Sequence, residues 1–496
     1  MFKNSEKIDF EIALDKTGFG KYNICLLIAC CLQILAMYMD IFGFSIILPS
    51  VACDMGLSTS QQGLLSAMPL IGVMISSYAW GLCADTLGRR ITLLVAMPIG
   101  LALSLVSGIA PTYASLATLK FLSAAFSSSA NAAAFVLLGE SVPPRLRNKF
   151  MFLMASATMY VQLVLCVIAL GVYQLSFNIY LPIINIYYRP WRLILQLNTL
   201  PGIIGTLGVI FLNESPKFLL SNGKEEEAIA VLKSIHRWNK GSNCEELSIS
   251  TIHLDEDIIP VAGSSLLEKI WNQTVPLFKP PLLKNSLILY YIILCAYMTA
   301  TGYTMWIPTV TNAFFNGEDN ANKTFCEVAS TATSANKTDC NNTIKLKTYY
   351  AVMLYSGISG SLNVLLTFLV GPLGKKTLTI LVFAVSISAG TLLFFVKQPI
   401  MNIALFFLFL YVALILGNVN TYLVEVNPTH LRGMATCLSV VVARGFGFFS
   451  VQIIAILLAD HCVPLIGGYI ALVLSGLLVA IFLPTDRNGT SEKNFK

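Results

Sequence analysis

Charged residues are scarce in this sequence. Only 12% of its 496 residues are Asp, Glu, Lys or Arg, whereas 56% are hydrophobic. A soluble protein of this length carries far more charge on its surface. The shortage therefore argues against a soluble enzyme or binding domain and favours a chain that lies in a membrane.

Motifs of catalysis and of nucleotide or metal binding are also missing. The sequence contains no G-x-x-x-x-G-K-[ST], no G-x-S-x-G, no CxxC pair and no Cys/His cluster with zinc spacing. We therefore expect no enzyme activity, no cofactor and no metal site, while coupling to a proton or ion gradient stays open. The net charge of +6 comes from basic residues dispersed in short loops, which argues against nucleic-acid binding.

Long apolar runs are abundant. Runs of about 20 residues, enough to cross a bilayer as a helix, recur along the chain. The sequence predicts an all-α membrane protein with twelve transmembrane helices in two six-helix halves. The spans are expected near 22–48, 62–83, 91–110, 113–138, 151–174, 192–212, 286–310, 348–370, 378–396, 399–423, 434–458 and 463–484.

The basic residues predict the orientation of these spans. With the N-terminus inside, 23 of the 32 Lys and Arg lie in cytoplasmic loops and tails, as the positive-inside rule requires. The predicted parts are a cytoplasmic tail, an N-terminal half, a cytoplasmic linker, a C-terminal half and a second cytoplasmic tail, over 1–21, 22–212, 213–285, 286–484 and 485–496.

The linker has a helical pattern over 224–241, with acidic residues first, basic residues last and a glycine at the end. This helix either joins the two halves or acts as a gate or partner site.

The N-terminal segment is too long and too acidic before the first span for a cleaved signal peptide.

The loop 312–347, predicted to lie outside, contains three N-x-T sequons at Asn322, Asn336 and Asn341. We expect glycosylation at these asparagines. Cys326 and Cys340 lie in the same loop and are expected to form a disulfide in an oxidising lumen or exterior, with two free cysteines as the alternative.

An internal repeat is the most informative pattern. Glu140-Ser-Val-Pro-Pro-Arg-Leu-Arg147 follows the fourth span, and Glu425-Val-Asn-Pro-Thr-His-Leu-Arg432 follows the tenth, 285 residues later. Gly88-Arg89-Arg90 and Gly374-Lys375-Lys376 are separated by 286 residues. Two motifs with nearly one offset indicate one six-helix unit used twice.

These motifs resemble the major facilitator superfamily, whose halves are related about an axis along the membrane normal. The stretch from Gly81 to Arg90 matches its signature G-x-x-x-D-x-x-G-R-R. The resemblance implies an inner gate, in which Arg89 and Arg90 reach Glu140 and Asp85 pairs with the facing half near Arg432. Charges that only fix topology and packing are a compatible reading. The gate set is Gly81, Asp85, Gly88, Arg89, Arg90, Glu140, Arg147, Glu425 and Arg432.

Further stretches resemble one branch, the synaptic vesicle glycoprotein 2 and organic-ion-transporter group. They are Gly18-Phe-Gly-Lys21, LPSVACDMGLS (48–58), Asn213-Glu-Ser-Pro-Lys-Phe-Leu219, the segment after it, and NPTHLRGMATCLSVVVARGFG (427–447). The resemblance implies either a carrier for an organic solute or a vesicle scaffold or trafficking protein with little transport.

Three charges fall inside predicted spans: Asp40, Lys120 and Arg444. Such charges are costly in a bilayer, so they must face protein or a wet cavity. Asp40 is predicted to be a counter-charge for a cationic substrate or a proton acceptor, and Arg444 to bind an anionic group or to neutralise Asp40. A purely structural Asp–Arg or Asp–Lys pair is the alternative. The predicted cavity lining is Asp40, Lys120, Tyr297, Trp306, Asn363, Asn418 and Arg444.

Together these patterns favour a secondary-active or facilitative carrier that moves a small organic solute, with an organic ion among the candidates, by alternating access. Its expected partners are that solute and the lipid bilayer, not nucleic acid, and we expect a monomer. The membrane is predicted to be the plasma membrane or that of a secretory or synaptic vesicle, with both termini in the cytoplasm.

Overall fold

The computed structural model is mainly helical, as the apolar runs predict. It describes residues 8–175, 177–241, 249, 251–253, 271, 274–316, 322–330, 344–427 and 429–484. Eleven helical segments within these ranges are long and apolar enough to cross a membrane, or twelve if a bent pair counts as one. The bent pair is α8 (Pro144–Met159) and α9 (Val161–Tyr173), which meet at 42° and cover the residues of the expected fifth span. The predicted fold class is confirmed.

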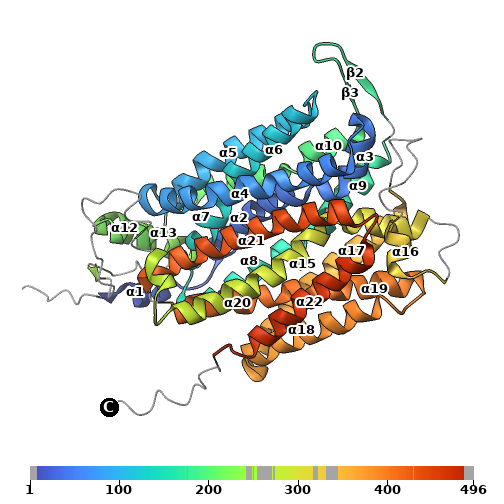
Figure 1. Ribbon diagram of the computed structural model, residues 1–496. Coiled ribbons are helices and arrows are strands. Elements are labelled where there is room, and N and C mark those ends of the chain that lie inside the picture. The colour runs from blue at the N-terminus through green and yellow to red at the C-terminus, as the bar shows by residue number, and fades with distance from the viewer. Residues whose placement is uncertain are drawn as a thin grey trace, which may run out of the picture. The chain divides into compact units, whose positions relative to one another are not determined.

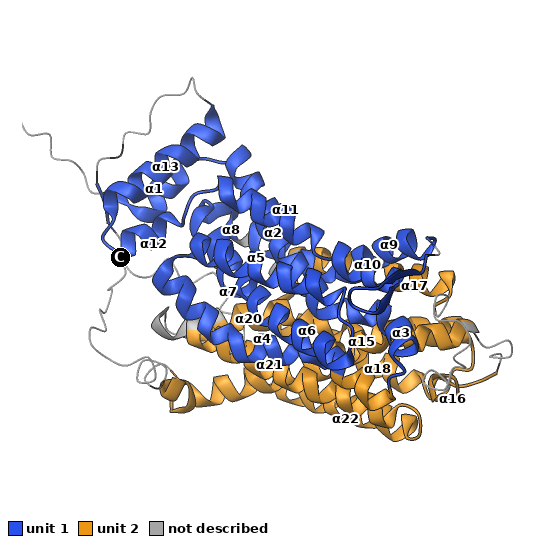
Figure 2. Cartoon of the chain, turned by 90° about the horizontal axis from the view of Figure 1, so that it is seen from above, with its two compact units in different colours: residues 1–57, 65–269, 339–343 blue, residues 58–64, 270–338, 344–496 orange. Residues whose placement is uncertain are grey.

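The chain divides into two compact units, coloured separately in Figure 2. Unit 1 comprises residues 1–57, 65–269 and 339–343, and unit 2 comprises 58–64, 270–338 and 344–496. The helix α4 (Thr59–Leu87) passes from unit 2 into unit 1.

Unit 1 contains the first spans. Its helices are α2 (Lys21–Phe42), α3 (Phe44–Met55), α5 (Arg89–Ser107), α6 (Tyr113–Ser127), α7 (Ser129–Ser141), α8, α9, α10 (Pro190–Leu197) and α11 (Leu200–Phe211). Within this bundle α2 packs on α11 and α7, and α5 packs on α6 and α7. This packing places one face of α2 against α6 and α5, where the candidate site lies.

A small domain covers one end of unit 1, where α1, α12 and α13 lie together (Figure 1). It consists of α1 (Phe10–Lys16), α12 (Pro216–Ser221), α13 (Glu225–Lys240) and a parallel pair of short strands, β1 (Ile8–Asp9) and β4 (Ile252–His253). Its core contains Phe10, Leu14 and Leu232. The helix predicted over 224–241 is α13, and it ends before Gly241, whose φ of 91° suits glycine.

At the other end of unit 1, β2 (Ile179–Leu181) and β3 (Ile186–Tyr188) form an antiparallel hairpin between α9 and α10 (Figure 1). Asp54, near the end of α3, forms a salt bridge of 2.6 Å with Arg189. It also accepts a hydrogen bond of 3.1 Å from Trp191 Nε1. These contacts fix the base of the hairpin to the first span.

Unit 2 holds the later spans. Its elements include η1 (Val275–Phe278), α15 (Leu283–Asn316), α16 (Phe325–Ala329), α17 (Leu346–Leu373), α18 (Lys375–Leu392), α19 (Pro399–Leu410), η3 (Tyr411–Ile415), α20 (Leu416–Val426), α21 (Thr429–Leu457) and α22 (Cys462–Ala480). The long α15 packs on α21 and α22, and α18 packs on α22 and α19.

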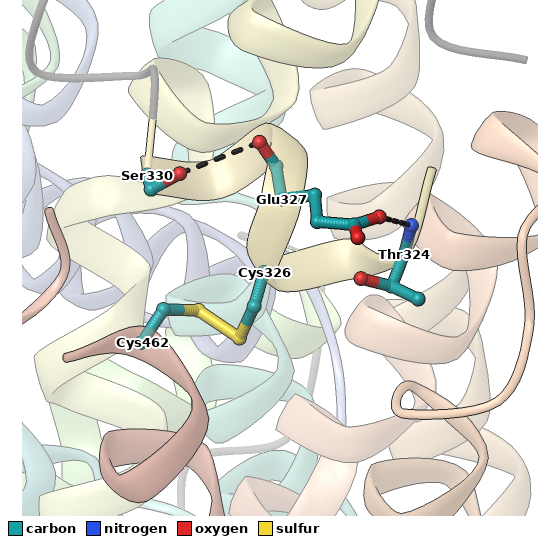
Figure 3. The surroundings of a disulfide bond; sticks show 5 residues. All are labelled: Thr324, Cys326, Glu327, Ser330 and Cys462. Atoms are coloured by element: carbon teal, nitrogen blue, oxygen red, sulfur yellow. Dashed lines mark hydrogen bonds between the residues drawn. A yellow bond between two sulfur atoms is a disulfide. The ribbon is translucent and has the colours of Figure 1, made fainter. Parts of the chain in front are cut away.

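The expected Cys326–Cys340 disulfide is wrong. Cys326 on α16 is bonded to Cys462, the first residue of α22, 136 positions further along the chain (Figure 3). At the start of α16, Thr324 donates hydrogen bonds to the carboxylate of the exposed Glu327. These bonds lower the pKa of Glu327 below its usual value. Proximity in sequence suggested Cys340, whereas the packing of α16 on α22 brings Cys462 to Cys326. Cys340 lies outside the described residues.

Candidate functional site

The buried carboxylate Asp40 is the centre of the candidate site. It lies on α2, and its closest partner is the ammonium of Lys120 on α6, with which it forms a salt bridge. Ser104 on α5 donates a hydrogen bond to Oδ1 at 2.8 Å, and Ser123 on α6 donates to Oδ2. Ser127 adds a longer bond of 3.4 Å to Oδ2. Four donors from two helices therefore surround one carboxylate.

Helical spacing explains why α6 supplies three of these groups. Lys120, Ser123 and Ser127 are separated by three and four residues, so they lie on one face of the helix, and this face meets α2. The side chain of Lys120 is 1% exposed, and its ammonium lies 5.7 Å from the centre of the Phe44 ring. An ion pair this deeply buried tolerates the loss of water only because its partners are so close.

The sequence left open whether Asp40 pairs with Lys120 or with Arg444. In the structure Asp40 pairs with Lys120. Arg444 on α21 is buried, and its guanidinium carbon lies 5.6 Å from the centre of the Tyr297 ring on α15. Asp40 belongs to unit 1 and Arg444 to unit 2, so each unit contains a buried charged side chain of the predicted set.

A small cavity adjoins Asp40. Its lining includes Ser104, Ser127, Asn198 and Thr199, and it has room for about one water molecule. Asn198 is 4% exposed, and neither atom of its side-chain amide has a hydrogen-bond partner among the described residues. It lies at the break between α10 and α11, a position that sequence reasoning did not identify.

The other predicted lining residues lie in unit 2. Trp306 on α15, Asn363 on α17 and Asn418 on α20 are all buried, while Tyr297 is half-buried. Trp306 is completely buried, and its neighbour Tyr303 packs against Phe406 and Tyr469 in an aromatic cluster. Burial is consistent with either a substrate-binding or a packing role for this set.

Some of the contacts expected for the inner gate are present, while the gating role itself stays a prediction. The guanidinium of Arg89 forms salt bridges of 3.1 Å with both Asp85 and Glu140. Asp85 remains 70% exposed. Gly81 lies one helical turn before Asp85, and the side chains of Glu425 and Arg432 lie outside the described part of the structure. The pairing of Asp85 with the facing half therefore stays a prediction.

The expected contact between Arg90 and Glu140 is wrong. Arg90 instead donates to the carbonyl oxygens of Val209 at 3.2 Å and Ile210 at 2.7 Å, at the end of α11. Consecutive residues of a helix point in different directions, about 100° apart, so Arg89 and Arg90 cannot reach the same carboxylate easily.

Glu214 is the residue of this network that sequence reasoning missed. Its carboxylate accepts hydrogen bonds of 3.0 Å from the backbone N–H groups of Arg89 and Arg90, which begin α5. A carboxylate is stabilised there by the unpaired N–H groups and by the helix dipole. Gly88 has a φ of 110°, and a Cβ at this position would lie 2.5 Å from Glu214. The need for an acceptor at the start of α5 was the available signal.

Arg147 also differs from expectation. It was assigned to the gate, but it pairs with Glu11 of α1 at 2.7 Å, while the neighbouring Arg145 pairs with Asp15 at 3.0 Å. The repeated arginine of the first half thus holds the N-terminal helix α1 against the start of α8.

Nothing in the described part of the chain gathers three or more His, Cys, Asp or Glu side chains that could hold a metal ion. Both carboxylate oxygens of Asp40 already accept hydrogen bonds, and one of them also forms the ion pair with Lys120.

Comparison with known proteins places this geometry in context. The sequence model of the Major Facilitator Superfamily matches residues 30–451. Human synaptic vesicle glycoprotein 2B is 24% identical over 331 residues, which are 62% of this chain and 48% of that protein. Human synaptic vesicle glycoprotein 2A is 24% identical over 322 residues, or 60% of this chain and 43% of that protein. The matched region thus spans about half the length of these curated relatives.

Solved structures with a similar fold include the xylose transporter XylE from E. coli. Its partially occluded inward-open form aligns with a TM-score of 0.66 at 16% identity, covering 95% of this chain and 99% of that chain. Its inward-open form aligns with a TM-score of 0.65 at 16% identity, covering 94% of this chain and 98% of that one. At this identity the likeness concerns the fold.

Proposed function

The chain belongs to the major facilitator superfamily, and from this premise we propose that it is a carrier that moves a small organic solute through a membrane by alternating access. The observation that carries the proposal is the buried pair of Asp40 and Lys120. Charged side chains within a membrane are costly, and those that are present commonly bind a substrate or an ion or pair with each other in a functional site.

The pair supplies a mechanism for recognition. A cationic group of a solute, or a proton, competes with the ammonium of Lys120 for the carboxylate of Asp40. When Lys120 is displaced, Ser104 and Ser123 remain as donors to Asp40 and keep the carboxylate in place. The exchange couples occupation of the site to a change in packing between α2 and α6.

The inner network provides the second element of the proposed cycle. Arg89, Asp85 and Glu140 tie the ends of α5, α4 and α7 together. Interhelical ion pairs of this kind stabilise one arrangement of a half and must change partners when the access side changes.

The proposed site of action is the plasma membrane or a vesicle membrane, with glycosylation at Asn322, Asn336 and Asn341 on the outer side.

Thermal unfolding tests the recognition step. A ligand that binds only the folded carrier raises its unfolding temperature. We would screen organic cations, organic anions, sugars and amino acids with the purified full chain, and repeat each hit with Asp40→Asn. We expect a hit whose stabilisation is lost in Asp40→Asn.

The matched control is Glu226→Gln, which makes the same carboxylate-to-amide change on the exposed face of α13. It should retain the full shift. If Asp40→Asn kept the full shift for every hit, Asp40 would not be part of the binding site. If no compound in the panel stabilised the wild type, the scaffold or trafficking role would be favoured over the carrier.

A further inference from the structure

The hairpin formed by β2 and β3 has a composition that its position in a loop does not require. Between Gln174 and Tyr188 the chain contains no charged residue. Its exposed side chains are mostly large and apolar: Leu175, Ile179, Tyr180, Ile183 and Tyr187. Ile183, in the turn, is 96% exposed. A loop that lay wholly in water would gain nothing from such a surface and would risk aggregation.

The hairpin is ordered by its own contacts. Tyr180 pairs with Tyr187 across the two strands, with ring centres 5.3 Å apart, and the hydroxyl of Tyr180 donates to Asn185 at 2.8 Å. Phe177 stacks on Tyr188 with ring centres 6.0 Å apart. The Arg189–Asp54 salt bridge fixes its base. The apolar side chains are therefore presented by a rigid element instead of collapsing onto the bundle.

The neighbours of the hairpin identify what it meets. It begins where the fifth span ends and ends where the sixth begins, so it lies at the depth of a membrane–water interface. Figure 1 shows it leaving the end of the bundle to the side, across the direction of the helices of unit 1. Exposed apolar side chains lie on the two adjoining spans, among them Val167 on α9 and Leu200 and Ile204 on α11, as expected for surfaces that face lipid.

We infer that this hairpin lies in the interfacial layer of the bilayer, with Ile183 and the tyrosines among the lipid headgroups. Tyrosine suits this layer because its ring is apolar and its hydroxyl is polar. A surface without charge can enter the interface without the cost of removing ions from water. The hairpin thereby acts as an anchor that fixes the outer ends of the fifth and sixth spans at the headgroup level.

A fluorescent probe at the turn tests this inference. The protein with Ile183→Cys would be reconstituted into phosphatidylcholine vesicles and labelled with an environment-sensitive thiol dye, with the unsubstituted protein giving the background from native cysteines. Since Ile183 projects from the fold, the substitution should leave folding intact. We expect blue-shifted emission that is quenched by lipids carrying a spin label on the headgroup and hardly quenched by iodide in the water.

Lys323→Cys is the control, because Lys323 is an exposed charged residue just before α16. Its dye should show the reverse pattern. The inference is overturned if the dye at position 183 responds to iodide as the control does, since the hairpin would then lie in water. It is also overturned if neither quencher reaches the dye, because the turn would then be covered by a protein partner or a second copy of the chain.

Discussion

At the scale of single residues, the energetics of Asp40 and Lys120 are set by their mutual burial. Removing one partner of a buried pair leaves a charge with no opposite charge and typically costs about 3–5 kcal/mol. Removing both leaves a neutral site of similar shape. The pair should therefore behave as one unit in mutagenesis.

A double-mutant cycle measures this coupling. We expect Asp40→Asn and Lys120→Met each to lower the unfolding temperature, and the combined variant to be more stable than either single variant. Thermal unfolding in detergent is the readout. If the two single effects simply added in the combined variant, the salt bridge would make no energetic contribution, and the exchange mechanism would lose its basis.

Glu214 carries a second prediction at this scale. Glu214→Gln keeps the shape of the side chain but removes its charge from the start of α5, so the unfolding free energy should fall by about 1–2 kcal/mol. The same change at Glu226, which lies in the first turn of α13 but is exposed to water, should cost less than about 1 kcal/mol. Equal losses in the two variants would show that Glu214 does not cap α5.

The sequence could predict the residues of the site better than their partners. Asp40, Lys120 and Arg444 stand out because a charge within an apolar run is rare. The choice between Lys120 and Arg444 as the partner of Asp40 required the packing of α2 on α6. Glu214 and Arg147 act through contacts with α5 and α1 that are distant along the chain, and no local pattern encodes such contacts.

At the scale of elements, the breaks between helices follow the repeat closely. In the first half α7 ends at Ser141 and α8 begins at Pro144, and in the second half α20 ends at Val426 and α21 begins at Thr429. Each pair of boundaries is separated by 285 residues. Gly88 and Gly374, which precede α5 and α18, both have a positive φ. Repeated sequence thus yields repeated backbone geometry.

The Cys326–Cys462 disulfide joins α16 to α22 in unit 2. It closes a loop across a sequence separation of 136 residues, for which chain entropy gives a stabilisation of about 4–5 kcal/mol. The double variant Cys326→Ser/Cys462→Ser should unfold at a lower temperature than the wild type under non-reducing conditions.

The control for this prediction is Cys295→Ser, which removes a free buried thiol from α15. It should cost much less than loss of the disulfide. An unchanged unfolding temperature in the double variant would indicate that the Cys326–Cys462 bond does not form in the purified protein.

At the scale of the whole molecule, the apolar runs and the internal repeat were sufficient to predict the fold class, because a bilayer requires apolar helices of fixed length. The bend between α8 and α9 was beyond that reasoning, since a run of apolar residues carries no signal for a change of direction. The sequence predicts the segments 1–21 and 213–285 as separate parts, but α1 and α13 belong to one small domain with a shared core.

The central claim is that the chain is a carrier whose site includes Asp40. Counterflow in vesicles tests it most directly. Vesicles that contain the reconstituted protein are loaded with an unlabelled solute that stabilises the protein, and the entry of labelled solute from outside is followed. The account predicts a transient accumulation of label with the wild type and with Glu226→Gln, and its loss with Asp40→Asn. Accumulation that is equal in Asp40→Asn and the wild type, or that is absent for every stabilising solute, would contradict it.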